Sequence, residues 1–298
     1  MAVELNKNET RMLTGLIIGL VVLGCLYYGG VFLLLLIAIS VYLGSKEYVE
    51  ILKHKGFYPS LKVILVSDLI LTLLFCINNS DWILAAVTIC TIMSFMWVLF
   101  KGRQPYIANV ATTILGFLYG GWLTLHLILL RGLNSAGGLD ISLNNSQGIG
   151  YIFFLFFVIL ATDTGCYFIG SKLGKRQLAP TVSPKKTIEG AVGGFVWAIV
   201  TAVFIGYLIN IPFVHSFILG GLCSVFAQIG DLCESLIKRD AGVKDSSDII
   251  PGHGGFLDRT DSYVFTMPVM YYYVKLVIIG NQAGWSEIVE GLLHGFGL

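Results

Sequence analysis

The sequence predicts an all-α, polytopic membrane protein with about nine transmembrane helices, and three observations support this class. Hydrophobic residues make up 56% of the 298 residues and charged residues only 12%, which is far from the usage of soluble domains. The apolar residues form runs of roughly 20, the length that an α-helix needs to cross a bilayer. Lys and Arg are also distributed very unevenly among the connections between these runs.

The apolar runs give the predicted spans in chain order. They cover residues 12–28, 29–45, 61–78, 82–100, 107–130, 149–171, 187–209, 212–237 and 262–280. The sequence leaves open whether 12–45 forms two spans or one long one, and the Tyr-Tyr-Gly-Gly segment at 27–30 favours a turn. Because the connections are short, we expect one integral membrane domain over 1–298, with an N-terminal multispan region at 1–148 and the polar motifs in 149–280.

The distribution of basic residues predicts the orientation. With the spans above, 17 of the 19 Lys and Arg residues fall on the side of the N-terminus. The positive-inside rule therefore places the N-terminus and the polar strip from Ser235 to Asp261 in the cytoplasm. The net charge of +1, without a basic tail, indicates no nucleic-acid partner. A compact chain without long cytosolic tails favours a bacterial inner membrane.

Acidic residues within the spans are few, and each costs about 2.5–3.5 kcal/mol at mid-membrane, so each needs a partner or a function. Asp231, Glu234 and Lys238 follow one another at helical spacing, on one face of a helix. Asp163 lies at a similar predicted depth on another span. A shared cation explains these positions; the alternative is that Asp163 only accepts hydrogen bonds from neighbouring helices. Asp68 has no similar neighbours, which favours a structural role.

The connection before the span at 187–209 contains a candidate anion site. We expect Ser183 to be the helix N-cap and Pro184 the first helical residue. Lys185 and Lys186 then fall in the first turn, where acids are usually preferred. A phosphate ligand resolves this conflict, because free amides, the positive helix end and ammonium groups together bind anions. The alternative is that both lysines only anchor the span at lipid headgroups.

The polar strip at 235–261 combines three kinds of residue. These are the glycines Gly254 and Gly255, the cations Lys238, Arg239, Lys244 and Arg259, and the acids Asp258 and Asp261. Glycine backbone can approach a ligand closely, the cations can neutralise phosphate charge, and carboxylates together with substrate phosphates suit Mg²⁺. For His253, the roles of proton donor, phosphate ligand and structural donor stay open.

Several familiar sites are missing from the sequence. There is no P-loop motif, no strand-linked G-x-G-x-x-G motif and no constellation of Ser, Cys and His typical of nucleophilic catalysis. The six cysteines fall in apolar runs without C-x-x-C spacing, so we expect buried small hydrophobic residues rather than disulfides or a zinc site.

The polar strip resembles the signature of the CDP-diacylglycerol synthases, also called phosphatidate cytidylyltransferases. The positions that match the family pattern are Ser235, Lys238, Arg239, Lys244, Asp245, Ser247, Ile250, Pro251, His253, Gly254, Gly255, Phe256, Asp258, Arg259 and Asp261. The segments 163–170 and 183–190 also resemble family blocks. The resemblance covers residues 150–275, whereas the N-terminal half agrees only in having several spans.

The resemblance implies a Mg²⁺-dependent reaction of CTP with phosphatidate, which yields CDP-diacylglycerol and pyrophosphate at a membrane. On this basis we expect metal binding by Asp231, Asp258 and Asp261, catalytic roles for Asp231, Asp258, Lys238, Arg239, His253 and Arg259, and substrate binding by Lys185, Lys186, Ser183, Lys244, Gly254, Gly255 and Asp163. A second, monovalent cation and a homodimer are left open. So are acyl-chain preference and the number of metal ions.

Two other functions compete with this interpretation. A transporter or ion channel is one, because intramembrane acids also mark ion pathways, although the internal repeats common in transporters are not found. A CTP-dependent kinase that acts on a lipid alcohol is the other, and it would release CDP instead of pyrophosphate.

Overall fold

The structure is a computed structural model that describes residues 7–77, 80–133, 146–247, 249 and 254–280. In this part of the chain, seven helices are long and apolar enough to cross a membrane. The prediction of an all-α, polytopic fold is confirmed, and the chain is an integral membrane protein. All six cysteines are free; Cys90 and Cys223 are buried as expected, whereas the other four are only partly buried.

The predicted spans coincide with helical stretches of the described chain. The elements are α1 (Lys7–Tyr28), α2 (Gly30–His54), α3 (Leu61–Ile77), α4 (Ser80–Lys101), α5 (Tyr106–Gly116), η1 (Phe117–Trp122), α6 (Leu123–Arg131), α7 (Ser146–Leu173), β1 (Gln177–Ala179), β2 (Ser183–Thr187), α8 (Ile188–Leu208), α9 (Phe213–Asp240), α10 (Leu257–Tyr273) and η2 (Val274–Ile279). The π-helical segments η1 and η2 continue their neighbouring α-helices. Since α1 and α3 are not among the seven helices that are long and apolar enough to cross a membrane, the number of crossings and the side of the N-terminus stay predictions.

The long apolar run at 12–45 is divided at Gly29, as the Tyr-Tyr-Gly-Gly segment indicated. Gly29 has φ 66° and ψ −151°, a conformation that side-chain-bearing residues rarely adopt. The helix that contains the second run continues beyond residue 45, because α2 ends at His54. The charged residues beyond 45 alternate with buried Tyr48, Ile51 and Leu52, so the apolar face of the helix extends past the apolar run.

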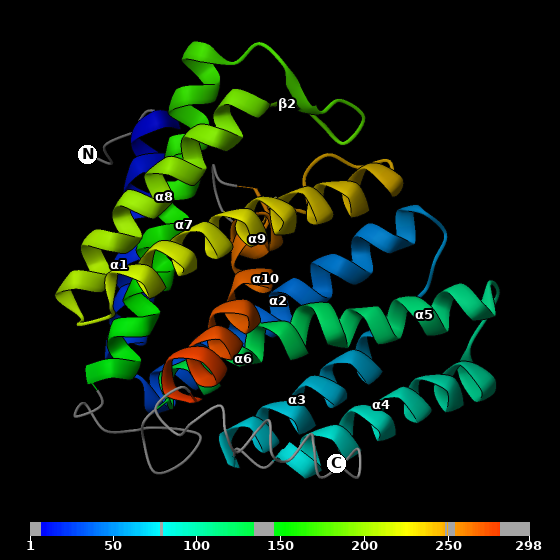
Figure 1. The fold of residues 1–298 in the computed structure, drawn as a ribbon. Coiled ribbons are helices and arrows are strands. Elements are labelled where there is room, and N and C mark those ends of the chain that lie inside the picture. Colours follow the sequence, from blue (N-terminus) through cyan, green and yellow to red (C-terminus); the bar gives the residue numbers. More distant parts are fainter. Residues whose placement is uncertain (1–6, 78–79, 134–145, 248, 250–253, 281–298) are drawn as a thin grey trace, which may run out of the picture.

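Helix α10 lies between two groups of helices (Figure 1). On one side, α7 packs against α8, α8 against α9, and α9 against α10. On the other side, α10 contacts α6 and α2, and α3 contacts α4, η1 and α6. In Figure 1, α7 and α8 lie toward the upper left, and α3 and α4 toward the lower right. The first turns of α10 therefore meet residues from both halves of the sequence.

The predicted helix start at Ser183 is wrong, because residues 183–187 form strand β2. Antiparallel pairing aligns Gln177 with Thr187 and Ala179 with Ser183. The helix begins at Ile188, and the hydroxyl of its N-cap residue Thr187 accepts a hydrogen bond from the Gly190 amide at 3.1 Å. Pairing with β1 and a competing cap thus override the Ser-Pro signal. As a result, Lys185 and Lys186 precede the helix on an extended strand.

Close approach of α9 and α10 depends on Gly230. A β-carbon added there would lie 2.5 Å from the carbonyl oxygen of Asp261 on α10, too close for any side chain. Because the obstructing atom belongs to the backbone, one helix would have to move. Gly230 therefore brings the neighbouring residue Asp231 close to α10.

We expect Gly230→Ala to separate α9 from α10 and to destabilise the protein by about 1–3 kcal/mol, the usual cost of overpacking. Thermal unfolding in detergent measures the change. Gly24→Ala is the control, because a β-carbon at Gly24 meets nothing within 4 Å. Equal unfolding temperatures for the two variants would contradict this account of the helix crossing.

Candidate active site

Lys238 joins two carboxylates at the contact between α9 and α10. Its ammonium nitrogen lies 2.5 Å from Oε2 of Glu234, one turn earlier on α9. It also forms an ion pair with Oδ1 of Asp258, in the first turn of α10. The side chains are 10%, 1% and 11% exposed for Lys238, Glu234 and Asp258, respectively. Two acids removed from water thus share one cation.

Asp258 is also held by the connection that precedes α10. Its Oδ2 accepts hydrogen bonds from the Ser246 amide (3.1 Å), the Ser246 hydroxyl (2.9 Å) and the Gly255 amide (3.0 Å). A β-carbon at Gly255 would overlap the Ser246 hydroxyl, and Gly254 has φ 82°. In this structure the two glycines allow the chain to fold tightly around Asp258, and their predicted approach to a substrate stays a prediction.

A second group of charges forms where α7, α9, α10 and β2 meet. The Lys186 ammonium, on β2, lies 2.5 Å from Oδ2 of Asp231 on α9. The charge of Asp163, on α7, lies within electrostatic range of Asp231, Lys186 and Arg259. Asp261, on α10, is within range of Asp231 and Asp163. The structure therefore brings together the acids that helical spacing placed at similar depth.

Carboxylates outnumber cations in these two groups. The carboxylates are those of Asp163, Asp231, Glu234, Asp258 and Asp261, and the cations that face them are Lys186, Lys238 and Arg259. Charges that are poorly hydrated require compensation by opposite charge or hydrogen bonds. The surplus of oxygen ligands is what a hard divalent cation prefers.

The predicted metal ligands do not form one ready-made group. Asp231 is paired with Lys186, Asp258 with Lys238, and one oxygen of Asp261 accepts a hydrogen bond from the Ser262 amide at 2.6 Å. Among the described residues, no group of three or more His, Cys, Asp or Glu has the arrangement of a metal site. The metal assignment therefore stays a prediction.

The remaining predicted site residues differ in their surroundings. Arg239 is exposed and donates to the carbonyls of Val182, in the β1–β2 turn, and Val243. Ser183 is half-buried on β2, whereas Lys185 and Lys244 are exposed. Arg239 thus connects the hairpin to the end of α9, a contact that sequence spacing did not indicate. His253 lies outside the described residues.

Glu47, on α2, is a residue that the sequence analysis missed. Its side chain is fully buried beside the start of α10. It accepts hydrogen bonds from the hydroxyls of Ser246 (3.0 Å) and Ser247 (2.5 Å). It also accepts from the amides of Phe256 (2.8 Å) and Leu257 (2.7 Å). If the helical pattern of the second span had been continued past residue 45, it would have placed Glu47 next to buried Tyr48. That position would have indicated a buried acid.

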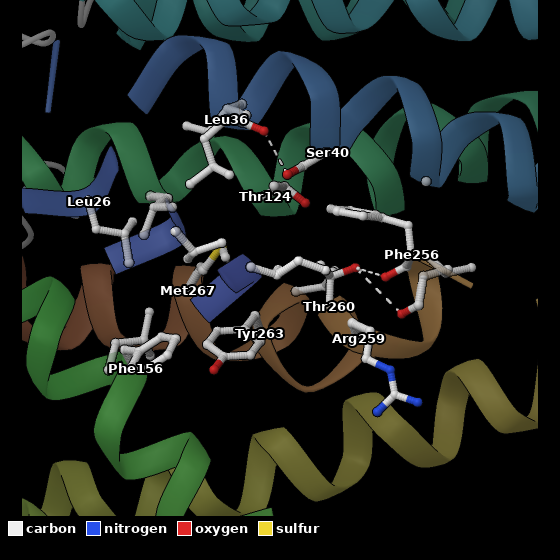
Figure 2. A pocket seen from close by; sticks show the side chains of 18 of the residues that line it. Leu26, Leu36, Ser40, Thr124, Phe156, Phe256, Arg259, Thr260, Tyr263 and Met267 are labelled. Atoms are coloured by element: carbon white, nitrogen blue, oxygen red, sulfur yellow. Dashed lines mark hydrogen bonds between the residues drawn. The ribbon is translucent and has the colours of Figure 1, made fainter. Parts of the chain in front are cut away.

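An apolar cavity of about 310 Å³ lies on the other side of the first turns of α10. Residues of α1, α2, η1, α6, α7 and α10 line it, and the lining residues with a polar side-chain group include Ser40, Thr124, Arg259, Thr260, Tyr119 and Tyr263. In Figure 2, the guanidinium of Arg259 points away from the apolar side chains and toward α9. Arg259 therefore connects the cavity to the charged groups.

Comparison with known proteins decides the family. A model of the cytidylyltransferase family matches residues 9–277. The chain belongs to the cytidylyltransferase family. It is 35% identical to a phosphatidate cytidylyltransferase of Synechocystis sp. over 291 residues, which cover 90% of this chain and 97% of that protein. It is 32% identical to the chloroplastic phosphatidate cytidylyltransferase 4 of Arabidopsis thaliana over 296 residues, which cover 91% and 74% of the two chains.

The similarity is higher over a shorter stretch in another member of the cytidylyltransferase family. A phosphatidate cytidylyltransferase of Bacillus subtilis is 47% identical over 134 residues, 44% of this chain and 50% of that protein. These relatives confirm the family that the polar strip indicated.

Lys238→Met is expected to leave Glu234 and Asp258 unpaired away from water and to destabilise the protein by about 3–5 kcal/mol, as breaking a buried ion pair does. The matched control is Lys55→Met, which removes a half-exposed pair with Asp240 at 2.9 Å and should cost about 1 kcal/mol or less. Thermal unfolding in detergent compares the two. A similar loss in both variants would show that Lys238 has no special role.

Proposed function

We propose that this protein transfers the cytidylyl group of CTP to phosphatidate, giving CDP-diacylglycerol and pyrophosphate. The observation that supports this proposal best is the position of the paired charges at the α9–α10 contact, next to an apolar cavity. The chain that contains them belongs to the cytidylyltransferase family. The relatives named phosphatidate cytidylyltransferase support this choice of lipid. A lipid substrate needs an apolar site beside a charged one, and α10 has both.

The chemistry requires charge neutralisation more than proton transfer. An oxygen of the lipid phosphate forms a bond to the α-phosphorus of CTP, while the bond from that phosphorus to the pyrophosphate oxygen breaks. A phosphate monoester is largely dianionic at pH 7, because its second pKa is about 6, so no strong base is needed. The barrier is repulsion between two anions, which fixed cations reduce. We propose that Lys186, Lys238 and Arg259, which lie beside the carboxylates of α9 and α10, take this role.

The surplus of carboxylates fits a divalent cation. We propose that Asp231, Asp258 and Asp261 hold Mg²⁺. Asp163 lies within electrostatic range of Asp231 and Asp261, and Asp258 precedes Asp261 by about one turn of α10. The bound metal would supply positive charge for the substrate phosphates. The protein residues would orient it and keep the lysines close to the same phosphates.

We propose that the acyl region of phosphatidate enters the apolar cavity. Arg259 and Thr260 line the cavity, and the neighbouring Asp258 and Asp261 belong to the charged groups at α9. A lipid with its chains in the cavity would thus have its phosphate near Arg259. CTP would approach from the aqueous side, because the connection before α10 is predicted to be cytoplasmic.

Cellular placement follows from the same arrangement. We propose that the active site faces the cytoplasm, since the predicted positive-inside pattern places the polar strip there. A bacterial inner membrane agrees with the bacterial relatives, although plant chloroplasts also contain relatives. A homodimer stays a prediction.

Purified protein with labelled CTP and phosphatidate is expected to release pyrophosphate and form CDP-diacylglycerol only when Mg²⁺ is present. Asp231→Asn and Asp258→Asn should each lower the rate at least about a hundredfold, the scale of losing a main electrostatic group. The control is Asp240→Asn, because Asp240 is exposed at the end of α9 and pairs with the surface residue Lys55. Release of CDP in place of pyrophosphate would refute cytidylyl transfer and indicate a lipid kinase.

Gly19→Leu is expected to fill part of the cavity and raise KM for long-chain phosphatidate, with a smaller effect on a short-chain analogue. Gly24→Leu is the matched control on α1, because neither glycine has an atom within 4 Å of an added β-carbon and only Gly19 lines the cavity. Steady-state kinetics in mixed micelles give both values. An equal effect of both substitutions on KM, or no effect of either, would show that the cavity is not part of the lipid-binding site.

A further inference from the structure

We infer that Glu47 is a positioning residue that holds residues 246–247 and the start of α10, and thereby Asp258 and Lys238, in the arrangement needed for the reaction. This inference rests on the proposed function, because it assumes that Asp258 and Lys238 take part in it. Glu47 does not touch either residue through an ion pair in the structure; it acts through Ser246 and the start of α10.

The hydrogen-bond donors of Glu47 come from two separate parts of the connection. Oε1 accepts from the Ser247 hydroxyl and the Phe256 amide. Oε2 accepts from the Ser246 hydroxyl and the Leu257 amide. The carboxylate therefore joins the segment just after α9 to the segment just before α10, in a way that a residue with a single acceptor atom cannot.

The position of Glu47 also suits the physical needs of α10. The first amides of a helix have no partners within the helix, and a negative charge at this end is favoured by the helix dipole. Phe256 and Leu257 supply two such amides to Glu47, at 2.8 and 2.7 Å. Because the carboxylate is fully buried, removing these donors would leave a buried charge without hydrogen bonds. Removing the carboxylate would likewise leave the two amides without an acceptor, and either change would lower the stability of the fold.

Ser246 connects Glu47 to Asp258. Its hydroxyl oxygen lies 3.0 Å from Oε2 of Glu47 and 2.9 Å from Oδ2 of Asp258. A hydroxyl has one hydrogen to donate, so it serves one carboxylate at a time, while the Ser246 amide stays on Asp258 at 3.1 Å. A change at Glu47 therefore reaches Asp258 through one intervening residue.

The test is Glu47→Gln, with Glu50→Gln as the control. Both acids are on α2, but Glu50 is exposed. In Glu47→Gln an NH₂ group replaces one carboxylate oxygen and faces two hydrogen-bond donors. The start of α10 and Asp258 should then be held less firmly, and kcat should fall about tenfold or more. KM for CTP and for phosphatidate should each change by less than about threefold, because the side chains proposed to bind the two substrates are unchanged. Glu50→Gln should match the wild type.

Hydrogen exchange separates positioning from general stability. Amides in 254–262 should exchange at least about tenfold faster in Glu47→Gln, while those of α8 keep the wild-type rate. Unchanged kcat or unchanged exchange at 254–262 would overturn the inference, and so would faster exchange throughout the chain. If Glu47→Gln does not fold, Ser247→Ala removes one of the same hydrogen bonds and should show the same local pattern at a smaller size.

The two proposals can fail separately. Wild-type protein that forms no CDP-diacylglycerol would overturn the proposed function, whatever the variants do. An active wild type whose kcat and local exchange are insensitive to Glu47→Gln would overturn only the role of Glu47.

Discussion

Compensation of charge away from water is the constraint on which the rest of this structure depends. Lys238 on α9 compensates the charge of Glu234 on the same helix and, across the helix contact, that of Asp258 on α10. Gly230 lets the same two helices approach within backbone contact further along. The helices are therefore fixed at two points, one electrostatic and one steric, and the region between them contains the acids of the candidate site.

Helix α10 separates two environments that a lipid-modifying enzyme must keep adjacent. Its first turns face the paired charges at α9 on one side and the apolar cavity on the other. Arg259 belongs to both, since it lines the cavity and acts on the charge of Asp163. An amphiphilic substrate can thus be recognised by one short stretch of helix, with its polar and apolar parts sorted to opposite faces.

Features that depend on local sequence were predictable, whereas those that depend on distant partners were not. The helical spacing of Asp231, Glu234 and Lys238 gave their common face, and the apolar runs gave the helices. The start of α8 was misplaced because strand pairing with β1, not the Ser183-Pro184 signal, decides the conformation of 183–187. Glu47 was missed because its donors lie about 200 residues away along the chain, and no periodic pattern records such a contact.

The contacts of Glu47 also bear on what the smallest working unit of this protein is. The region 149–280 contains the family motifs, yet the acceptor for Ser246, Ser247 and the start of α10 is supplied by α2. A fragment that begins after α6 would retain the polar strip and lose the carboxylate that accepts these hydrogen bonds. The N-terminal helices are thus more than a membrane anchor, because they supply a buried acceptor to the half of the chain that contains the motifs.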